Sequence, residues 1–334
     1  MAIDLFKKGR DFLGVDYPII SGGMTWISDF ALMKAVSNAG AFPVFASGNM
    51  PPDLFEIEID RLVREIKKPF AVNLITIAPN YRAHFDILLR KEVPFVIFAG
   101  NFPTKNDVVT MKAAGKKTIS FAAVESIAEK QINWGIDALI LEGNEAGGHI
   151  GYVSLIVLLQ QVLFKFRDFP IFAAGGLGTG QIMAHLLLMG AYGVQMGTRF
   201  VLSTECSAHE KFKTAFRRAK AREAIATPQY DSKLPVVGVR ALNNKGMENF
   251  GHLQLELLKK LENNEICKEE AQYQVENYWA GSLRKAVQEG DVEYGSLMAG
   301  QSVGLFSDIK SVHQIVQDLM KEANEELARV KGLF

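Results

Sequence analysis

Short apolar runs alternate with amphipathic stretches from the start of the chain to about residue 200, and this alternation limits the possible folds more than any other feature. The runs are rich in β-branched residues and do not alternate between polar and apolar positions, which is typical of strands buried on both faces of a parallel sheet. The stretches between them have the apolar spacing of helices. The predicted strands are residues 17–20, 42–46, 70–76, 95–99, 117–121, 138–141, 171–174 and 193–196.

Strands and helices that alternate in this way predict an α/β fold, and eight strands point to a (β/α)8 TIM barrel. An open, doubly wound sheet is the alternative. It is disfavoured because the repeats keep a nearly constant length and no Gly-x-Gly-x-x-Gly fingerprint follows the first strand. The pattern changes near residue 205. We expect a barrel domain over residues 1–208, a small, mainly helical inserted domain over 209–286, and a C-terminal segment, 287–334, that packs back on the barrel.

Composition excludes several classes of protein. The 334 residues are 48% hydrophobic, as in a globular protein with a sizeable core. Lys plus Arg and Asp plus Glu are 37 each, and this neutral balance argues against nucleic-acid binding. The two cysteines, Cys206 and Cys267, are too few for a four-thiolate iron–sulfur cluster and lack metal-binding spacing. No signal peptide or long apolar span is apparent, so we expect a cytoplasmic protein without a membrane or metal site.

In a TIM barrel the active site lies at the C-terminal ends of the strands, so the residues that follow each strand carry most information. Gly22 and Gly23 follow the first strand; they indicate either a tight turn or the close approach of a flat ligand. Asn73 lies in the buried third strand, where its amide needs partners from the backbone or from a ligand.

The loop after the sixth strand, residues 142–151, reads EGNEAGGHIG and sets His149 among four glycines. A single histidine is more often structural than catalytic. This position, directly after a barrel strand, favours catalysis. Glu142 and Glu145 can orient a base or form a surface pair. Of the other histidines, we expect His185 to pack among leucines and His84, His252 and His313 to be exposed, and His209 is left open.

Glycine-rich loops also follow the seventh and eighth strands, over residues 174–180 and 195–200. Barrels of this kind bind phosphate with these two loops and a helix N-terminus, whose backbone N–H groups face the anion. Turn formation alone explains one such loop but not both. The predicted phosphate ligands are Gly175, Gly176, Gly197 and Thr198. A late glycine-rich segment, residues 290–301, is either a linker or a return to the barrel mouth.

Taken together, these loops resemble one superfamily. The motifs are GGMTW at 22–26, PFAVN at 69–73, EGNEAGGHIG at 142–151, AAGG at 173–176, QMGTRF at 195–200 and GSLMAGQ at 295–301. In order and spacing they resemble the nitronate monooxygenase (2-nitropropane dioxygenase) and FMN-dependent type II enoyl-acyl-carrier-protein reductase superfamily. The third and the last of these motifs, in their EAGGHIG and GSLMAGQ stretches, are most similar to the enoyl reductase branch.

This resemblance implies an FMN-dependent enoyl-acyl-carrier-protein reductase with NADH or NADPH as reductant and, in some members, a monovalent cation. The alternatives are a nitronate monooxygenase or an NAD(P)H:quinone reductase on the same barrel. His149 would be the active-site histidine. The cofactor-binding residues implied are Gly22, Gly23, Met24, Asn73, Glu142, Gly147, Gly148, Ala174, Gly175, Gly176, Gln195, Met196, Gly197, Thr198, Met298 and Gln301.

The expected partners follow from the same resemblance: an acyl carrier protein or coenzyme A thioester as substrate, and a second copy of the chain in a homodimer. A basic stretch over residues 211–222 can steer an acidic carrier or simply form a solvated surface. A rival from another class is a flavin-free barrel isomerase or lyase. It is disfavoured because no lysine ends a predicted strand and no clear acid–base pair is present.

Overall fold

The protein was analysed as a computed structural model that describes residues 4–48, 50–234, 236 and 238–333. Its eight-stranded sheet is parallel throughout, in the order β1-β9-β8-β6-β5-β4-β3-β2. A parallel bridge between Ile20 and Phe42 joins the first and second strands and brings the sheet to near closure. The strands are β1 (Ile19–Ser21), β2 (Val44–Ala46), β3 (Ala71–Ile75), β4 (Phe95–Ala99), β5 (Lys117–Ala122), β6 (Ala138–Glu142), β8 (Ile171–Ala174) and β9 (Gly193–Met196).

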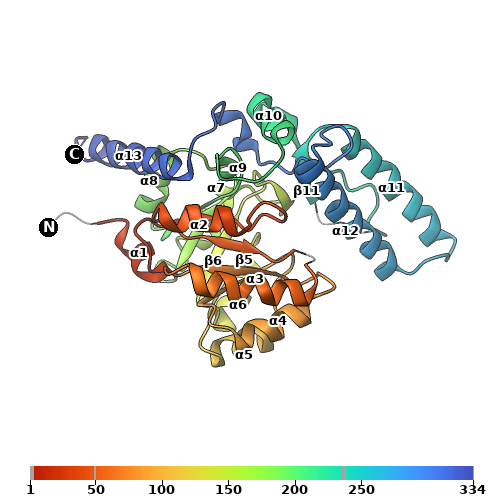
Figure 1. Ribbon diagram of the computed structural model, residues 1–334, viewed down its shortest axis with the longest axis horizontal. Coiled ribbons are helices and arrows are strands. Elements are labelled where there is room, and N and C mark those ends of the chain that lie inside the picture. Colours follow the sequence, from red (N-terminus) through yellow and green to blue (C-terminus); the bar gives the residue numbers. More distant parts are fainter. Residues whose placement is uncertain (1–3, 49, 235, 237, 334) are drawn as a thin grey trace.

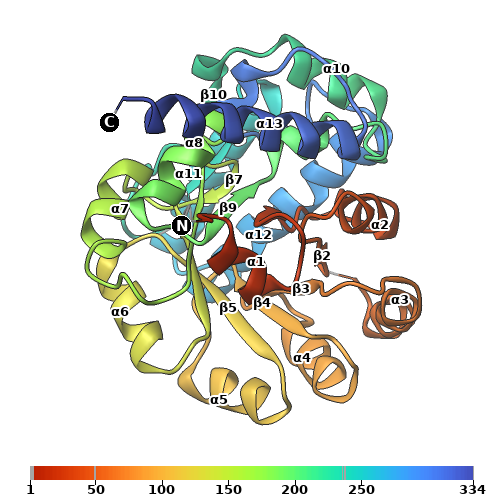
Figure 2. The same cartoon turned by 90° about the vertical axis from the view of Figure 1, so that its left-hand side faces the viewer.

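Helices surround this barrel, as the end-on view in Figure 2 shows. Their apolar faces pack on the outer side of the strands in one large cluster of buried residues. The predicted (β/α)8 barrel is therefore confirmed, with each of its predicted strands found within a few residues of its predicted bounds. The helices are α2 (Phe30–Asn38), α3 (Pro52–Glu65), α4 (Tyr81–Arg90), α5 (Lys105–Ala113), α6 (Glu125–Asn133), α7 (Leu155–Val162) and α8 (Gly180–Met189).

The barrel interior is a second, smaller apolar cluster that includes Phe42, Phe95 and Phe172. An N-terminal helix, α1 (Lys7–Leu13), closes its bottom, since Leu13 and the following Val15 belong to the same cluster. Gly9 lets this helix approach the sheet, because a Cβ there would lie 1.8 Å from the carbonyl oxygen of Tyr192. The open end of the barrel is consequently the other one, where the strands end.

A small insertion follows the barrel and stands at this open end (Figure 1). Two helices, α11 (Lys245–Glu262) and α12 (Lys268–Arg284), pack on a three-stranded antiparallel sheet. The sheet order is β10 (Ala224–Ala226), β11 (Gly238–Leu242) and β7 (Gly148–Ile150). The insertion was predicted as mainly helical; of its residues, Pro235 and Val237 lie outside the described residues. The sheet was not predicted, and its third strand comes from the barrel's own His149 loop.

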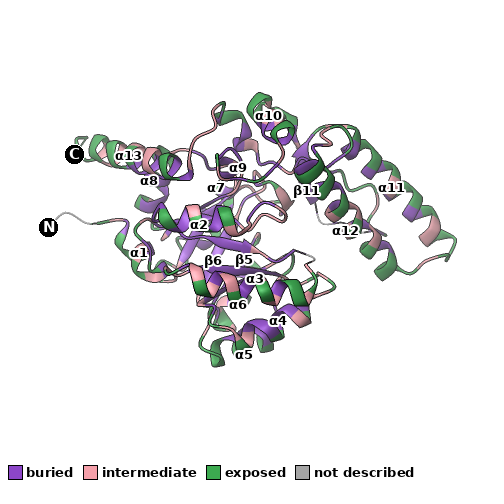
Figure 3. Ribbon diagram, viewed as in Figure 1, coloured by how far each residue is buried: buried purple, intermediate pink, exposed green. Residues whose placement is uncertain are grey.

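The insertion has its own apolar core, which includes Val239, Phe250 and Trp279. In Figure 3 the inner sides of α11 and α12 are buried and their outer sides are exposed. The preceding helix, α10 (Glu210–Arg218), packs differently: Phe212 and Phe216 join the outer core of the barrel. The predicted domain boundaries at residues 208 and 286 stay a prediction.

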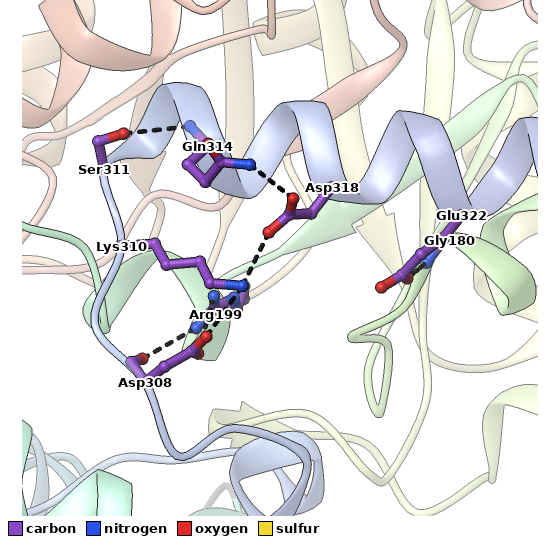
Figure 4. A network of polar contacts seen from close by, with 8 residues as sticks. All are labelled: Gly180, Arg199, Asp308, Lys310, Ser311, Gln314, Asp318 and Glu322. Atoms are coloured by element: carbon purple, nitrogen blue, oxygen red, sulfur yellow. Dashed lines mark hydrogen bonds and ion pairs between the residues drawn. The ribbon is translucent and has the colours of Figure 1, made fainter.

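After α12 the chain returns to the barrel through a π-helical turn, η2 (Lys285–Glu289), and a 3-10 turn, η3 (Gln301–Leu305). The last helix, α13 (Val312–Lys331), packs against α8 and α2. Polar contacts fix this return segment (Figure 4): Arg199 binds Asp308 at 3.1 Å, and Lys310 binds both Asp308 and Asp318. Because Arg199 directly follows Thr198, this network also holds the loop after β9.

Candidate active site

The top layer of the barrel interior is polar. Side chains alternate along a strand, so Asn73 points inward like Ala71, and Glu142 points inward like Ile140. Gln195 is in register with the inward-facing Ala174 and Ile20. Asn73, Glu142 and Gln195 therefore form a polar floor at the open end, above an apolar interior.

This polar floor is incompletely satisfied. The Asn73 Oδ1 and Gln195 Oε1 atoms are buried and have no hydrogen-bond partner among the described residues. The Asn73 amide nitrogen donates to the Gly23 carbonyl across a long 3.5 Å. Unpaired buried polar atoms are rare and costly, so their presence at a barrel mouth indicates a ligand that supplies the missing partners.

Glu142 is the third member of the floor. Its side chain is partly buried, and desolvation raises the pKa of its carboxyl from 4.5 to about 8. No neighbouring charge contributes to that shift. A carboxyl in this state is largely protonated at neutral pH and can donate a hydrogen bond.

The glycines after β1 and β9 line the floor. A Cβ on Gly23 would lie 2.6 Å from the Asn73 amide nitrogen, and one on Gly22 would meet the Gln195 side chain. Gly197 lies beside the sulfur of Met24. The structure thus brings together most of the residues predicted from these loops. Met196 is the exception: its side chain is 2% exposed and faces the helices, so only its backbone is available at the mouth.

The predicted phosphate loops stack on the His149 loop and on the return segment. The Thr198 hydroxyl accepts a hydrogen bond from Gly300 N at 3.1 Å, and Gln301 N donates to the Glu145 carbonyl at 3.0 Å. Gly147 lies against Gly300, where a Cβ would be 2.4 Å from the Gly300 nitrogen. This packing brings Thr198, Gly147, Gly148 and Met298 together from distant parts of the chain, with Met298 beside Gly148.

Gly175 and Gly176 adopt left-handed backbone conformations, with φ of 98° and 70°, that favour glycine at both positions. The N-terminus of α8, which follows these glycines, is not available to a phosphate. Its first amide, Gly180 N, donates to the Glu322 carboxylate at 2.7 Å (Figure 4). The helix that begins at the mouth is instead the short α9 (Thr198–Val201), directly after Gly197.

His149 lies on β7, where it pairs with Val239 of β11. Its Nε2 atom is 3.4 Å from Oε2 of Glu276 on α12, and both side chains are about one-third exposed. Arg240 holds the start of this loop, since its guanidinium donates to the Asn144 carbonyl and side-chain oxygens at 3.0 and 2.9 Å. Sequence reasoning missed both Arg240 and Glu276, because neither lies after a barrel strand.

Glu145, left open between two roles, accepts a hydrogen bond from Leu155 N at 3.0 Å and so caps α7. His209 caps α10 through its Nδ1 atom. Two predictions for other histidines are wrong. His84 is 1% exposed, bonds the Met50 carbonyl at 2.8 Å and stacks on Phe55, so burial lowers its pKa. His185 is exposed and bonds Glu326 instead of packing among leucines.

The polar floor and the loops around it fit FMN. The flat ring carries hydrogen-bond donors and acceptors at its edge that would match the unpaired amide oxygens of Asn73 and Gln195. No group of three or more His, Cys, Asp or Glu side chains placed to hold a metal ion occurs in the described part of the chain. None of the helices in that part of the chain is long and apolar enough to cross a membrane.

Comparisons with known proteins agree with this geometry. FabK from Thermotoga maritima shares 36% identity, with a TM-score of 0.86 and coverage of 97% of this chain and 98% of that one. A nitroalkane oxidase from Streptomyces ansochromogenes shares 25% identity, with a TM-score of 0.80 and coverage of 97% and 99%.

Curated relatives match over a similar extent. A protein from Mycobacterium tuberculosis named (3aS,4S,5R,7aS)-5-hydroxy-7a-methyl-1-oxo-octahydro-1H-indene-4-carboxyl-CoA dehydrogenase is 27% identical, over 97% of both chains. A probable nitronate monooxygenase from Staphylococcus aureus is 26% identical, over 96% of this chain and 99% of its own. The sequence profile of the family described as nitronate monooxygenase matches residues 7–82 and 75–322. The resemblance seen in the sequence motifs is thereby confirmed: the chain belongs to the nitronate monooxygenase family of oxidoreductases, on the side that includes the Thermotoga FabK protein.

Proposed function

We propose that this oxidoreductase is an FMN-dependent reductase of enoyl thioesters that uses NADH or NADPH. The observation that carries the proposal is the barrel mouth itself: a floor with two unpaired amide oxygens, and His149 on a strand beside it. The 36% identity with Thermotoga FabK, against 25–27% for the nitroalkane oxidase and the curated relatives, favours the reductase branch. The M. tuberculosis relative's name, a carboxyl-CoA dehydrogenase, also supports a thioester substrate.

Bound FMN would supply hydride transfer to the β-carbon of the trans-2-enoyl group. Asn73 and Gln195 would bind the edge of its ring, with Glu142 beside them. The loops that contain Gly175, Gly176, Gly197 and Thr198 would hold its phosphate. Met298 and Gln301 would cover the ring from the return segment.

His149 would complete the reduction. As negative charge builds on the thioester oxygen, a hydrogen-bond donor placed there stabilises it, and a proton must then reach the α-carbon. An imidazole can do either near neutral pH. In a nitronate monooxygenase the same side chain would act in the opposite sense, as a base that removes a proton from a nitroalkane. The names of the Staphylococcus and Streptomyces proteins support this second candidate function.

An anaerobic visible spectrum tests the proposal. We expect the purified protein to show a flavin band that NADH or NADPH bleaches and that an enoyl thioester restores without oxygen. A flavin band that ignores both nicotinamides but is bleached by a nitronate would favour the monooxygenase. A colourless protein that cannot be reconstituted with FMN would contradict both functions. Reconstitution with and without K⁺ tests the monovalent cation in the same experiment.

A further inference from the structure

The insertion contributes a carboxylate to the active-site histidine. His149 and Val239 are cross-strand partners, so their side chains lie on the same face of the small sheet. Val239 on that face is fully buried in the core of the insertion, together with Val275 and Trp279 of α12. The face that carries His149 is therefore the face that α12 covers.

Glu276 follows Val275 directly on α12 and reaches the imidazole. Its Oε2 atom lies 3.4 Å from Nε2 of His149, a separation typical of an ion pair more than of an aligned hydrogen bond. The Nε2 atom is buried and has no hydrogen-bond partner among the described residues. A buried imidazole nitrogen that faces a carboxylate at this distance needs only a small rotation to donate its proton.

The charged side chain of Arg240 does not compete for this nitrogen. Arg240 pairs with Gly148, one residue along, and so points to the opposite face of the sheet. Its guanidinium is engaged there by Asn144. The His149 side chain is about one-third exposed although its Nε2 atom is buried, so the exposure is carried by the rest of the ring, which includes Nδ1.

We propose that Glu276 is a positioning residue for His149: its carboxylate accepts the Nε2 proton and leaves Nδ1 as the nitrogen that exchanges a proton with the substrate. This inference rests on the proposed function only in naming the substrate. In the reductive direction Nδ1–H of the imidazolium gives its proton to the α-carbon, and the neutral ring keeps Nε2–H on Glu276. A hydrogen bond at one ring nitrogen fixes the tautomer and orientation of the other in this way.

Proton NMR of the FMN-loaded protein, labelled with ¹⁵N-histidine, tests the contact without turnover. We expect a downfield Nε2–H resonance that exchanges slowly with water and disappears in both His149→Ala and Glu276→Ala. In Glu276→Gln it should move upfield, because a neutral oxygen accepts a weaker hydrogen bond than a carboxylate. Glu269→Ala removes an exposed acid from the first turn of the same helix and should leave the resonance unchanged.

Kinetics then separate positioning from folding. Glu276→Ala should keep its FMN band and its KM within about threefold while kcat falls about 10- to 100-fold, by analogy with the loss of a hydrogen-bond partner that orients a metal-ligating histidine. A resonance that is absent from the wild type, or that survives in Glu276→Ala, would overturn the proposal. So would an unchanged kcat in Glu276→Ala. A resonance that behaves as expected in a protein that reduces no enoyl thioester would sustain the role of Glu276 and reject the proposed function alone.

Discussion

The barrel and the insertion build the two halves of the site by different means. The polar floor stands on parallel strands whose neighbours fix each inward side chain by register, as with Gln195 beside Ala174. Beside it, His149 lies on a three-residue strand that a barrel loop adds to the insertion's sheet, and Glu276 lies on a helix of the insertion, each about one-third exposed. A rigid floor suits a bound cofactor, whereas a partly exposed pair beside it suits proton exchange with a substrate that must enter and leave.

The largest expected effect is on kcat, from replacing His149 beside the insertion. His149→Ala should retain FMN, because the polar floor and phosphate loops are untouched, and should lower kcat by about 10²- to 10⁴-fold, the usual contribution of a general acid or base. The FMN absorbance band and turnover with an enoyl thioester measure the two effects. Full activity in this variant would mean that His149 takes no part in the mechanism. Loss of FMN would mean that the histidine also supports cofactor binding, so that the two halves do not have separate roles.

The second-largest expected effect is on the stability of the folded protein, through Glu142 of the polar floor, and it depends on pH. The pKa of Glu142 is raised from 4.5 to about 8 in the folded protein, so between these values the folded state holds a proton that the unfolded state has lost. The stability from this group is present below pH 4.5 and is lost as pH rises through 8. Glu142→Gln cannot ionise, so its stability relative to wild type should increase over that window, by about 1.4 kcal/mol per pH unit at most.

Urea unfolding of both proteins without added cofactor, at pH 5, 6, 7, 8 and 9, measures this difference. We expect the two curves of stability against pH to diverge up to pH 8 and then to run parallel. Curves that stay parallel from pH 5 would mean that the Glu142 carboxyl is as well solvated as an ordinary surface acid.

Replacing a glycine by alanine should have opposite effects on stability in the two regions. Gly147→Ala would put a Cβ 2.4 Å from the Gly300 nitrogen, a backbone atom that cannot move aside. We expect a loss of about 1–3 kcal/mol in the free energy of unfolding, together with weaker FMN retention. Gly281→Ala on α12 meets nothing within 4 Å and should instead stabilise the protein by about 0.5–1 kcal/mol.

Thermal unfolding of the two variants, with FMN content measured alongside, checks the pair. Equal losses of stability in the two variants would mean that the packing of Gly147 against Gly300 is no tighter than the surroundings of Gly281 on α12. A stable Gly147→Ala protein with normal FMN content would show that the return segment can shift away from the His149 loop.

The same contrast explains what the sequence could predict. Barrel strands are continuous apolar runs at regular spacing, and each can be recognised from its own residues, as Phe95–Ala99 was. The ends of those strands pointed to Asn73, as a polar residue in a buried strand, and to His149, among glycines, without any knowledge of contacts, and the family resemblance added Gln195. Local sequence was sufficient there because the barrel topology decides which residues meet.

The insertion depends on contacts between distant segments. Strands of three residues, such as Gly148–Ile150, are too short to show a period, and nothing local indicates that they pair with residues 238–242. Glu276 is one of several acids on a charged helix, and only the packing of Val275 and Trp279 singles it out. One available signal was overlooked: the pair Asn263–Asn264, where Asn264 has a φ of 55°, separates α11 from α12 within the predicted helical domain.

The smallest effect concerns the border between the two regions, where α10 packs on the barrel and most of its basic side chains face outward. Arg217 and Arg218 line a surface hollow beside Ser307, and both are exposed, whereas Lys213 of the same helix is buried. If an acidic carrier docks here, charge reversal at both arginines should lower kcat/KM for carrier-linked substrate by about tenfold at low salt and leave the coenzyme A thioester unaffected. The difference should fade near 0.5 M salt, where surface charges are screened.

Arg217 also donates a hydrogen bond to the Ser307 carbonyl at 3.0 Å, so its replacement can disturb the return segment directly. Arg218→Glu alone is therefore the sharper variant, and Lys105→Glu at the start of α5, on the far side of the barrel in Figure 2, is its control. Loss on the carrier substrate in Arg218→Glu but not in Lys105→Glu would place carrier recognition at this border, outside both halves of the site. Equal loss on both substrates would instead mean that α10 supports the fold of the mouth and takes no part in binding a carrier.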